Sequence, residues 1–200
     1  ADNNIKLNCL PNDYVIKLSL SRDGKQVFAA TSIGLACLDR RNNSWTSTFK
    51  GVNCLNKNGF SHCVFVDSKN RVWFGTEDGA LCYDFKKGIH PKIYTTDEGL
   101  TDNCISSITE DYRGNIWIGS NFGLNKLIAK TGNITKYFAE NGLQSNEFGD
   151  GATCTMWDGK IILMGGTGGI NWFHADKVKQ HPWKANVVLS GIIIGNKHVN

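Results

Sequence analysis

Short stretches of alternating apolar and polar residues recur along this chain, and polar turns that contain glycine separate them. In the clearest example, an alternating stretch at 105–110 precedes a polar turn at 111–115 and an aromatic-containing strand that begins at 116. Further strands are expected at 124–127 and 134–138, on either side of a Gly-Asn turn. Asp-Gly and Gly-Asn pairs are hairpin signals because they accept positive φ angles. The pattern therefore predicts four short antiparallel strands in this unit.

The same unit occurs four times. Its second glycine recurs at intervals of 45, 44 and 46 residues, at Gly34, Gly79, Gly123 and Gly169. A large apolar residue keeps the same three intervals, at Phe28, Trp73, Trp117 and Leu163. Two columns with one period indicate a true repeat, and four antiparallel strands per unit are typical of a β-propeller blade.

We predict an all-β fold of four four-stranded antiparallel blades that form part of a larger β-propeller. The propeller part covers residues 1–178, with blades at about 12–54, 55–99, 100–143 and 144–178. A lone blade cannot bury both of its faces, so adjacent blades should stack with the repeated large apolar residue between them. The first repeated glycine should allow close approach of backbones, and the second should make the turn between strands two and three, as at Gly75 and Gly79.

Composition and charge narrow the function classes. Apolar residues make up 40% of the chain and charged residues 20%, which suits a folded domain. The net charge of +4 comes without a long basic block, so we expect no contact with nucleic acid. No stretch of about 18 apolar residues is present, and the polar residues 1–4 do not start a signal peptide.

The seven cysteines are interpreted mainly as small buried residues, because most lie among apolar neighbours. No C-x-x-C pair occurs, and the five histidines lack metal-binding spacing, so we expect no metal and no cofactor. A disulfide between Cys54 and Cys63 stays open at this level. The glycine-rich stretch at 165–169 lacks the Lys-Ser/Thr ending of a phosphate loop, and we identify no catalytic residues.

A binding site is more plausible on the loops that differ between units. In a propeller, the loops between strands two and three and the segments that enter each blade share one face. Carboxylates, amides and aromatic rings in these loops have the chemistry that sugars need. The candidate ligand-binding residues are Glu77, Asp78, Asn103, Asn121, Phe122, Asn146 and Glu147. The alternative for each position is that Asn and Asp are simply good turn residues.

The units resemble the two-component regulator propeller repeat, and the third unit carries the resemblance best. It matches the repeat pattern at Ile105, Ile108, Asp111, Gly114, Ile116, Trp117, Gly119, Gly123 and Leu124, with Ser120 where Thr is usual. The fourth unit is similar to the closing blade of such arrays. The first lacks the tryptophan, and Ala30 replaces its first glycine. The tail, 179–200, resembles a linker and the first strand of the β-sandwich that follows the propeller in this family.

The resemblance implies the periplasmic sensor part of a membrane-anchored hybrid two-component histidine kinase of the Bacteroides type. It implies binding of glycan-derived oligosaccharides and a relay to transcription of polysaccharide-utilisation genes. The segment itself would not be an enzyme. One alternative is a structural or dimerisation scaffold without its own ligand site, and a more remote one is a propeller polysaccharide lyase. Four blades leave two open blade faces, so we also expect a homodimer or other self-association.

Overall fold

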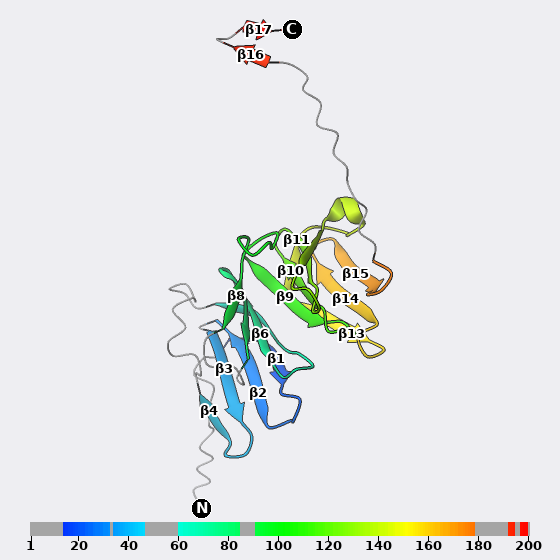
Figure 1. The fold of residues 1–200 in the computed structure, drawn as a ribbon. Coiled ribbons are helices and arrows are strands. Elements are labelled where there is room, and N and C mark those ends of the chain that lie inside the picture. The colour runs from blue at the N-terminus through cyan, green and yellow to red at the C-terminus, as the bar shows by residue number, and fades with distance from the viewer. Residues whose placement is uncertain are drawn as a thin grey trace, which may run out of the picture.

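The computed structural model of the chain is built from antiparallel β-sheets (Figure 1), and it describes residues 14–32, 34–46, 60–84, 91–178, 192–194 and 197–199. The first sheet contains β1 (Val15–Leu20), β2 (Gln26–Thr31), β3 (Gly34–Asp39) and β4 (Ser44–Thr46). The second contains β5 (Ser61–Val66), β6 (Val72–Thr76), β7 (Gly79–Tyr83) and β8 (Lys92–Tyr94). The third contains β9 (Ile105–Glu110), β10 (Ile116–Ser120), β11 (Gly123–Leu127) and β12 (Ile134–Tyr137).

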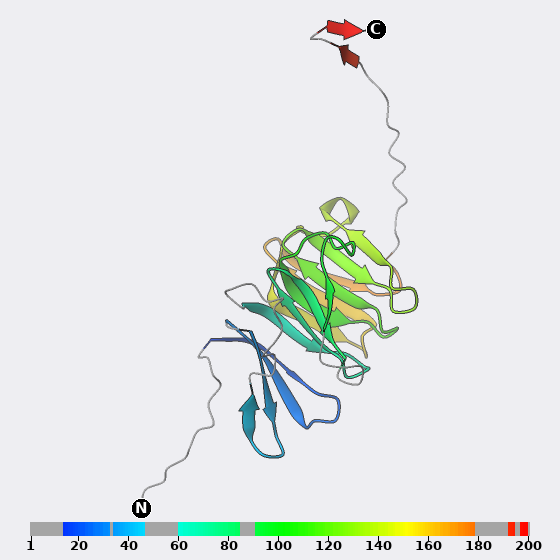
Figure 2. The same ribbon diagram turned by 60° about the vertical axis from the view of Figure 1, so that its left-hand side comes forward.

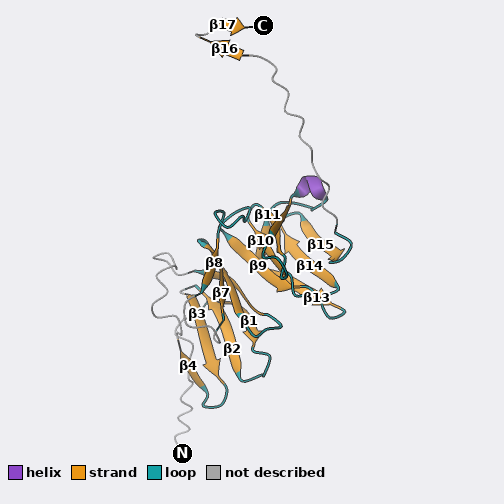
Figure 3. Cartoon of the chain, in the orientation of Figure 1, coloured by secondary structure: helices purple, strands orange, loops and turns teal. Residues whose placement is uncertain are grey.

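The fourth sheet contains β13 (Phe148–Met156), β14 (Ile161–Gly166) and β15 (Gly169–His174). Strands in all four sheets are ordered as in the sequence, so each sheet is an antiparallel meander. The predicted blades are confirmed, with the fourth showing three strands within the described residues. The one helix in the described part of the chain is a 3-10 turn at Ala139–Asn141, coloured purple in Figure 3, and none there is long and apolar enough to cross a membrane.

The first strand of each blade lies at the inner edge of the stack. Strand β5 contacts β1 and β9, β9 contacts β13, and β13 also contacts β1. The blades therefore follow one another around an axis, and Figure 2 shows the later sheets stacked face to face. We number the blades one to four in chain order.

Large side chains of the repeat fill the spaces between blades. Phe28 packs with Val64 and Phe74 between blades one and two, and its side chain is fully buried. Trp73 and Trp117 are fully buried in the same way at the next two interfaces, and each stacks on a tyrosine of its own fourth strand. The predicted place of the repeated residue between blades is confirmed for these three units.

Glycine is required at the two repeated positions for different structural reasons. A Cβ on Gly75 would lie 2.4 Å from the carbonyl oxygen of Ile105 in the next blade, so only glycine allows that approach. The second glycine begins strand three of each blade with a φ of 117°, 134°, 111° or 118°, a region that favours glycine. Both predicted roles are confirmed.

The tail forms a short antiparallel hairpin of β16 (Ile192–Ile194) and β17 (Lys197–Val199). A strand was expected within the tail at 179–200, and Ile192–Ile194 form one, while residues 179–191 lie outside the described residues. The β-sandwich to which this strand would belong stays a prediction.

Candidate functional site

Each innermost strand breaks its register close to the turn that joins strands two and three. The break falls between Val15 and Lys17 in β1 and between Ser61 and Cys63 in β5. In β9 it isolates Ser106, and in β13 it extends over 149–152. A β-bulge re-aims side chains and is common next to functional sites. The bulged residues vary in chemistry although the fold repeats.

His62, the bulged residue of β5, reaches residues of the next two blades. Its Nδ1 lies 3.0 Å from Oδ1 of Asp150 in β13. Its Nε2 lies 3.9 Å from Sγ of Cys104, in the segment that enters blade three. The imidazole also packs against Phe60, with ring centroids 4.8 Å apart. We call His62, Cys104 and Asp150 the axial cluster.

The electrostatics of the axial cluster disfavour a nucleophilic thiol. Burial, followed by the charges of Asp102, Glu77 and Asp150, raises the pKa of Cys104. Catalytic cysteines need the opposite shift, because the thiolate is the reactive form. The shift is opposite to the one that would activate the Cys104 thiol, and the cluster offers hydrogen-bonding groups and a carboxylate.

Lys17 joins blade one to blade four at the inner edge. Its Nζ donates a hydrogen bond of 2.8 Å to the carbonyl oxygen of Gly151. Burial lowers the pKa of this lysine. The Lys17 ammonium group thus lies at the inner edge of the stack, next to the bulged segment of β13.

Among the predicted site residues, Glu77 influences the axial cluster through its charge. It sits with Asp78 on the exposed turn between β6 and β7, and its charge acts on the Cys104 thiol. The backbone N–H of Asp78 donates to Oγ1 of Thr76 at 3.0 Å, which fixes the turn. Asn121 is also close, because its backbone N–H donates to the carbonyl oxygen of Cys104 at 3.1 Å.

Asn103 and Asn146 have equivalent structural roles. Oδ1 of Asn103 accepts from the backbone N–H of Thr96 at 2.8 Å, and Oδ1 of Asn146 accepts from that of Ala139 at 2.7 Å. Each amide closes the segment that enters its blade. Turn chemistry accounts for these two amide oxygens, and the binding role of the two residues stays a prediction.

Phe122 lies in the turn between β10 and β11, and Glu147 lies in the segment that enters blade four. Phe122 is 54% exposed, and its ring meets Phe138 at a centroid distance of 5.7 Å. The backbone of Glu147 is fixed by Ser145 and Thr167, and its side chain is exposed. Phe122 offers an aromatic surface for a ligand, and Glu147 offers a carboxylate.

Sequence reasoning missed His62, Cys104 and Asp150. The residue type at their repeat positions differs from blade to blade. For example, blade three has Ser106 at the position that His62 occupies in blade two, so the repeat alignment does not single these residues out. A signal that points to them is the extra residue in each innermost strand, which becomes visible only when strand pairing is known.

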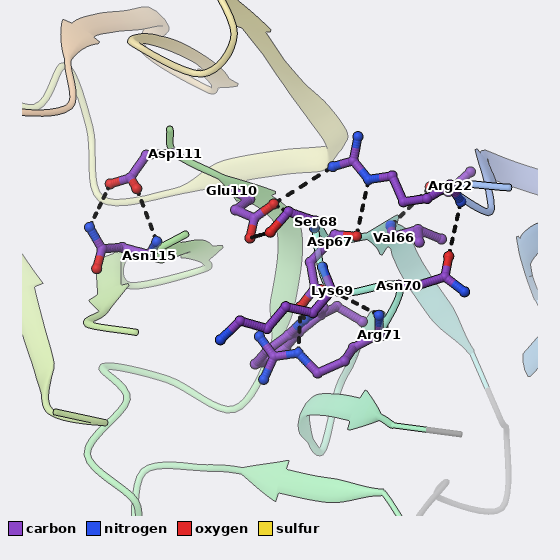
Figure 4. A network of polar contacts seen from close by, with 12 residues as sticks. Arg22, Val66, Asp67, Ser68, Lys69, Asn70, Arg71, Glu110, Asp111 and Asn115 are labelled. Atoms are coloured by element: carbon purple, nitrogen blue, oxygen red, sulfur yellow. Dashed lines mark hydrogen bonds and ion pairs between the residues drawn. The ribbon is translucent and has the colours of Figure 1, made fainter. Parts of the chain in front are cut away.

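The other end of the blades carries a polar network that has a structural role. Figure 4 shows Glu110 accepting hydrogen bonds from the backbone N–H and Oγ of Ser68, at 2.7 Å and 2.8 Å. Arg22 donates to the carbonyl oxygen of Asp67 at 3.1 Å and lies 3.7 Å from Glu110. These contacts link blades one, two and three. A cavity of about 550 Å³ lies beside them, and the Arg22–Glu110 pair lines it.

The cysteines largely follow the sequence interpretation. Cys37, Cys63 and Cys82 are buried, Cys104 is half-buried, and Cys154 is exposed. Cys63 is a free thiol, so the disulfide to Cys54 left open above is not formed, and Cys54 itself lies outside the described residues.

The chain is similar to known proteins both in sequence and in fold. Residues 54–78 and 99–122 match the two-component regulator propeller family. The chain is 26% identical to histidine kinase P4 of Formosa agariphila, over 68% of this chain and 13% of that protein. It thus spans a small part of the relative that it matches.

Two solved structures share the fold, and both are extracellular domains of hybrid two-component systems of Bacteroides thetaiotaomicron. One has a TM-score of 0.71 at 21% identity and covers 84% of this chain and 22% of that chain. The other has a TM-score of 0.69 at 20% identity and covers 86% of this chain and 24% of that chain. A streptogramin B lyase is more distant, with a TM-score of 0.56 at 17% identity, over 82% of this chain and 56% of that one.

Proposed function

We propose that this chain, whose second and third blades carry two-component regulator propeller repeats, is a ligand-binding part of the extracytoplasmic sensor of a hybrid two-component histidine kinase. The repeat match and the resemblance to a histidine kinase support the class of protein. The fold shared with extracellular domains of hybrid two-component systems supports a place outside the cytoplasm, which we propose to be the periplasm of a membrane-anchored protein.

The ligand that suits the loop face is an oligosaccharide released from a glycan. The observation that carries this proposal is the approach of His62 to Asp150 across two blades, 3.0 Å apart, beside the charge of Glu77. Imidazole, carboxylate and amide groups at one place can accept and donate hydrogen bonds to vicinal hydroxyls. Phe122 adds an exposed ring on the same face, on which a sugar can stack.

A ligand bound at the axial cluster would affect how blades two, three and four are positioned relative to one another. Cys104 enters blade three, whereas His62 and Asp150 belong to blades two and four. A ligand that bridges these groups changes the free energy of one blade arrangement relative to another, which is what a sensor needs. We propose that this difference passes to the kinase and on to transcription of polysaccharide-utilisation genes.

Calorimetric titration of the protein with oligosaccharides from several glycan classes tests the ligand. We expect binding to one class, and loss of about tenfold or more in affinity for Asp150→Asn and for His62→Gln, as for removal of charged or polar hydrogen-bond partners. Asp176→Asn, an exposed carboxylate beyond β15, is the matched control and should bind as the parent does. Absence of binding to every class would overturn the proposal.

We further propose that this segment binds its ligand without transforming it. The raised pKa of Cys104 supports this for one route only, because it disfavours the thiolate form in which this cysteine could act as a nucleophile. Incubation with the polysaccharide that yields the bound oligosaccharide, followed by chromatography of the products, should return the polymer unchanged. New unsaturated ends would instead favour a lyase.

A further inference from the structure

The two ends of the blades differ in charge. We define the loop face as the end that carries the turns between strands two and three and the segments that enter each blade. Backbone hydrogen bonds connect these parts: the N–H of Asn121 donates to the carbonyl oxygen of Cys104, and that of Thr167 to the carbonyl oxygen of Glu147. Because blades stack through their sheet faces, the loop face stays at the end of each blade whichever blades flank it.

Acidic residues gather on the loop face. Its described turns at 76–79, 120–123 and 166–169 and its described entering segments at 95–104 and 138–147 hold no Lys or Arg. The acidic residues of these segments are Glu77, Asp78, Asp97, Glu98, Asp102, Glu140 and Glu147. Asp150 adds a carboxylate from the bulge of β13. This end is therefore rich in negative charge, although the whole chain has a net charge of +4.

The opposite end of the blades, which carries the other turns, has a different balance. Acidic and basic residues are mixed there and form pairs (Figure 4). Arg22 lies 3.7 Å from Glu110, and Nε of Arg71 lies 2.6 Å from Oδ2 of Asp67. The negative charge of the loop face is thus a property of that face and not of the surface in general.

The carboxylates of the loop face act on the axial cluster. Oδ1 of Asp102 accepts a hydrogen bond of 2.7 Å from the backbone N–H of Cys104, and Asp150 lies 3.0 Å from His62. Burial, followed by the charges of Asp102, Glu77 and Asp150, raises the pKa of Cys104. Three carboxylates from different parts of the chain therefore contribute negative potential at one thiol.

Lys17 is the basic residue at the inner edge of this region. Its ammonium group donates a hydrogen bond of 2.8 Å to the carbonyl oxygen of Gly151. Its charge acts on the thiols of Cys63 and Cys154. The carboxylates next to Cys104 thus dominate the potential on the loop-face side of the cluster.

We propose that the loop face selects oligosaccharides without acidic groups and binds those that carry amino groups most tightly. The selection acts at the ligand site of the proposed function and rests on it. A carboxylate accepts hydrogen bonds and an ammonium group donates them, so the two match in charge and in hydrogen bonding. A uronate or a sulfate would instead place a like charge beside Glu77 or Asp150, which disfavours binding.

The Cys104 thiol allows the potential to be measured without any sugar. The intact chain is treated with a trimethylammonium methanethiosulfonate or with its sulfonate analogue, and peptide mass spectrometry assigns the modification to each cysteine. Rates are compared with those of a free cysteine derivative. At low ionic strength we expect Cys104 to favour the cationic reagent by about tenfold or more. Added salt should reduce this preference, because it screens the charges.

Substitutions show which charges cause the preference. Asp150→Asn and Glu77→Gln should each reduce it, whereas Asp176→Asn, an exposed carboxylate beyond β15, should leave it unchanged. Cys154, an exposed thiol on which Lys17 acts, should show a smaller preference within the same chain. Equal rates of the two reagents at Cys104 of the parent chain would overturn the proposal, and so would a preference that neither substitution reduces.

Calorimetry then connects the potential to the ligand. A glucosamine trisaccharide, its N-acetylated form and a galacturonic acid trisaccharide are compared at a pH at which the amino groups are protonated. We expect the amino form to bind most tightly, the acidic form not to bind, and the advantage of the amino form to decrease with salt.

The outcomes separate this inference from the proposed function. Binding of the galacturonic acid trisaccharide that His62→Gln abolishes would overturn the charge selection and still support an oligosaccharide site at the axial cluster. Tighter binding of the N-acetylated form than of the amino form would also overturn the selection. Absence of binding by every oligosaccharide would overturn the proposed function itself, whatever the thiol reagents show.

Discussion

Trp117 and Asp111 connect the packing between blades to the turn within a blade. The indole Nε1–H of Trp117 donates a hydrogen bond of 3.0 Å to Oδ2 of Asp111. Oδ1 of the same carboxylate accepts from the backbone N–H groups of Arg113 and Asn115, both at 2.9 Å, and so organises the turn into β10. Asp67 and Trp73 repeat the arrangement at 2.8 Å in blade two. The turn thereby sets the orientation of the ring that the next blade covers.

Trp117→Phe should lower the free energy of unfolding by about 1–3 kcal/mol, because a buried carboxylate oxygen loses a hydrogen-bond partner while most of the apolar surface stays. Trp117→Ala should cost about 3–5 kcal/mol, since it also leaves a cavity. Urea denaturation followed by circular dichroism measures both values. Trp157→Phe, at an exposed position, is the control and should change little. Equal effects of the three substitutions would contradict this account.

Gly75→Ala should destabilise the contact between blades two and three. The added Cβ would lie 2.4 Å from the carbonyl oxygen of Ile105, so the two backbones must separate. Overpacking of this kind costs about 1–3 kcal/mol. Thermal unfolding measures the loss, and Gly149→Ala is the control because its nearest neighbour, the Cβ of Ala152, lies at an ordinary 3.4 Å. A Gly75→Ala variant as stable as the parent would argue against tight packing at this position.

Glu110→Gln should weaken the link between blades one, two and three. The buried carboxylate accepts two hydrogen bonds from Ser68 and faces Arg22, and the amide can neither pair with the arginine nor accept as strongly. We expect a loss of about 1–3 kcal/mol in the free energy of unfolding. Glu140→Gln, an exposed residue of the 3-10 turn, should be neutral. Chemical denaturation distinguishes the two variants.

Stability should fall at alkaline pH because of buried thiols. Burial raises the pKa of Cys63 and of Cys82 to about 12, from an ordinary value of 9.0. Above pH 9 the unfolded chain releases these protons while the folded chain retains them, so ionisation favours unfolding until the folded pKa is reached. Their contribution is therefore fully present below pH 9 and is lost as the pH rises towards 12.

The urea midpoint measured from pH 8 upwards tests this prediction. The parent should lose stability steadily above pH 9, and Cys63→Ala should show a shallower dependence, whatever its stability at neutral pH. Cys154→Ala, at an exposed position, should leave the slope unchanged and serves as the control. A slope that Cys63→Ala does not alter would exclude this thiol as the cause.

Much of the fold was predictable because the same sequence pattern occurs four times in the chain. Phe28, Trp73 and Trp117 occupy the same repeat position and are all fully buried. The second glycine has a positive φ in every repeat. The roles of Asn103 and Asn146 were predictable in principle too, since they recur at the spacing of the repeat and close equivalent segments. Both amides have a structural role that follows from the repeat, and their part in ligand binding stays a prediction.

The axial cluster was not predictable by the same reasoning. His62, Cys104 and Asp150 come from three blades, and no spacing in the chain relates them.

The amino-acid sequence by itself determined the blades, since local strand pairing and turns depend on neighbours within about one repeat. Tertiary structure alone decided which bulged side chains meet at the axis. That meeting depends on how successive blades pack, through contacts between residues of different repeats such as Gly75 against Ile105.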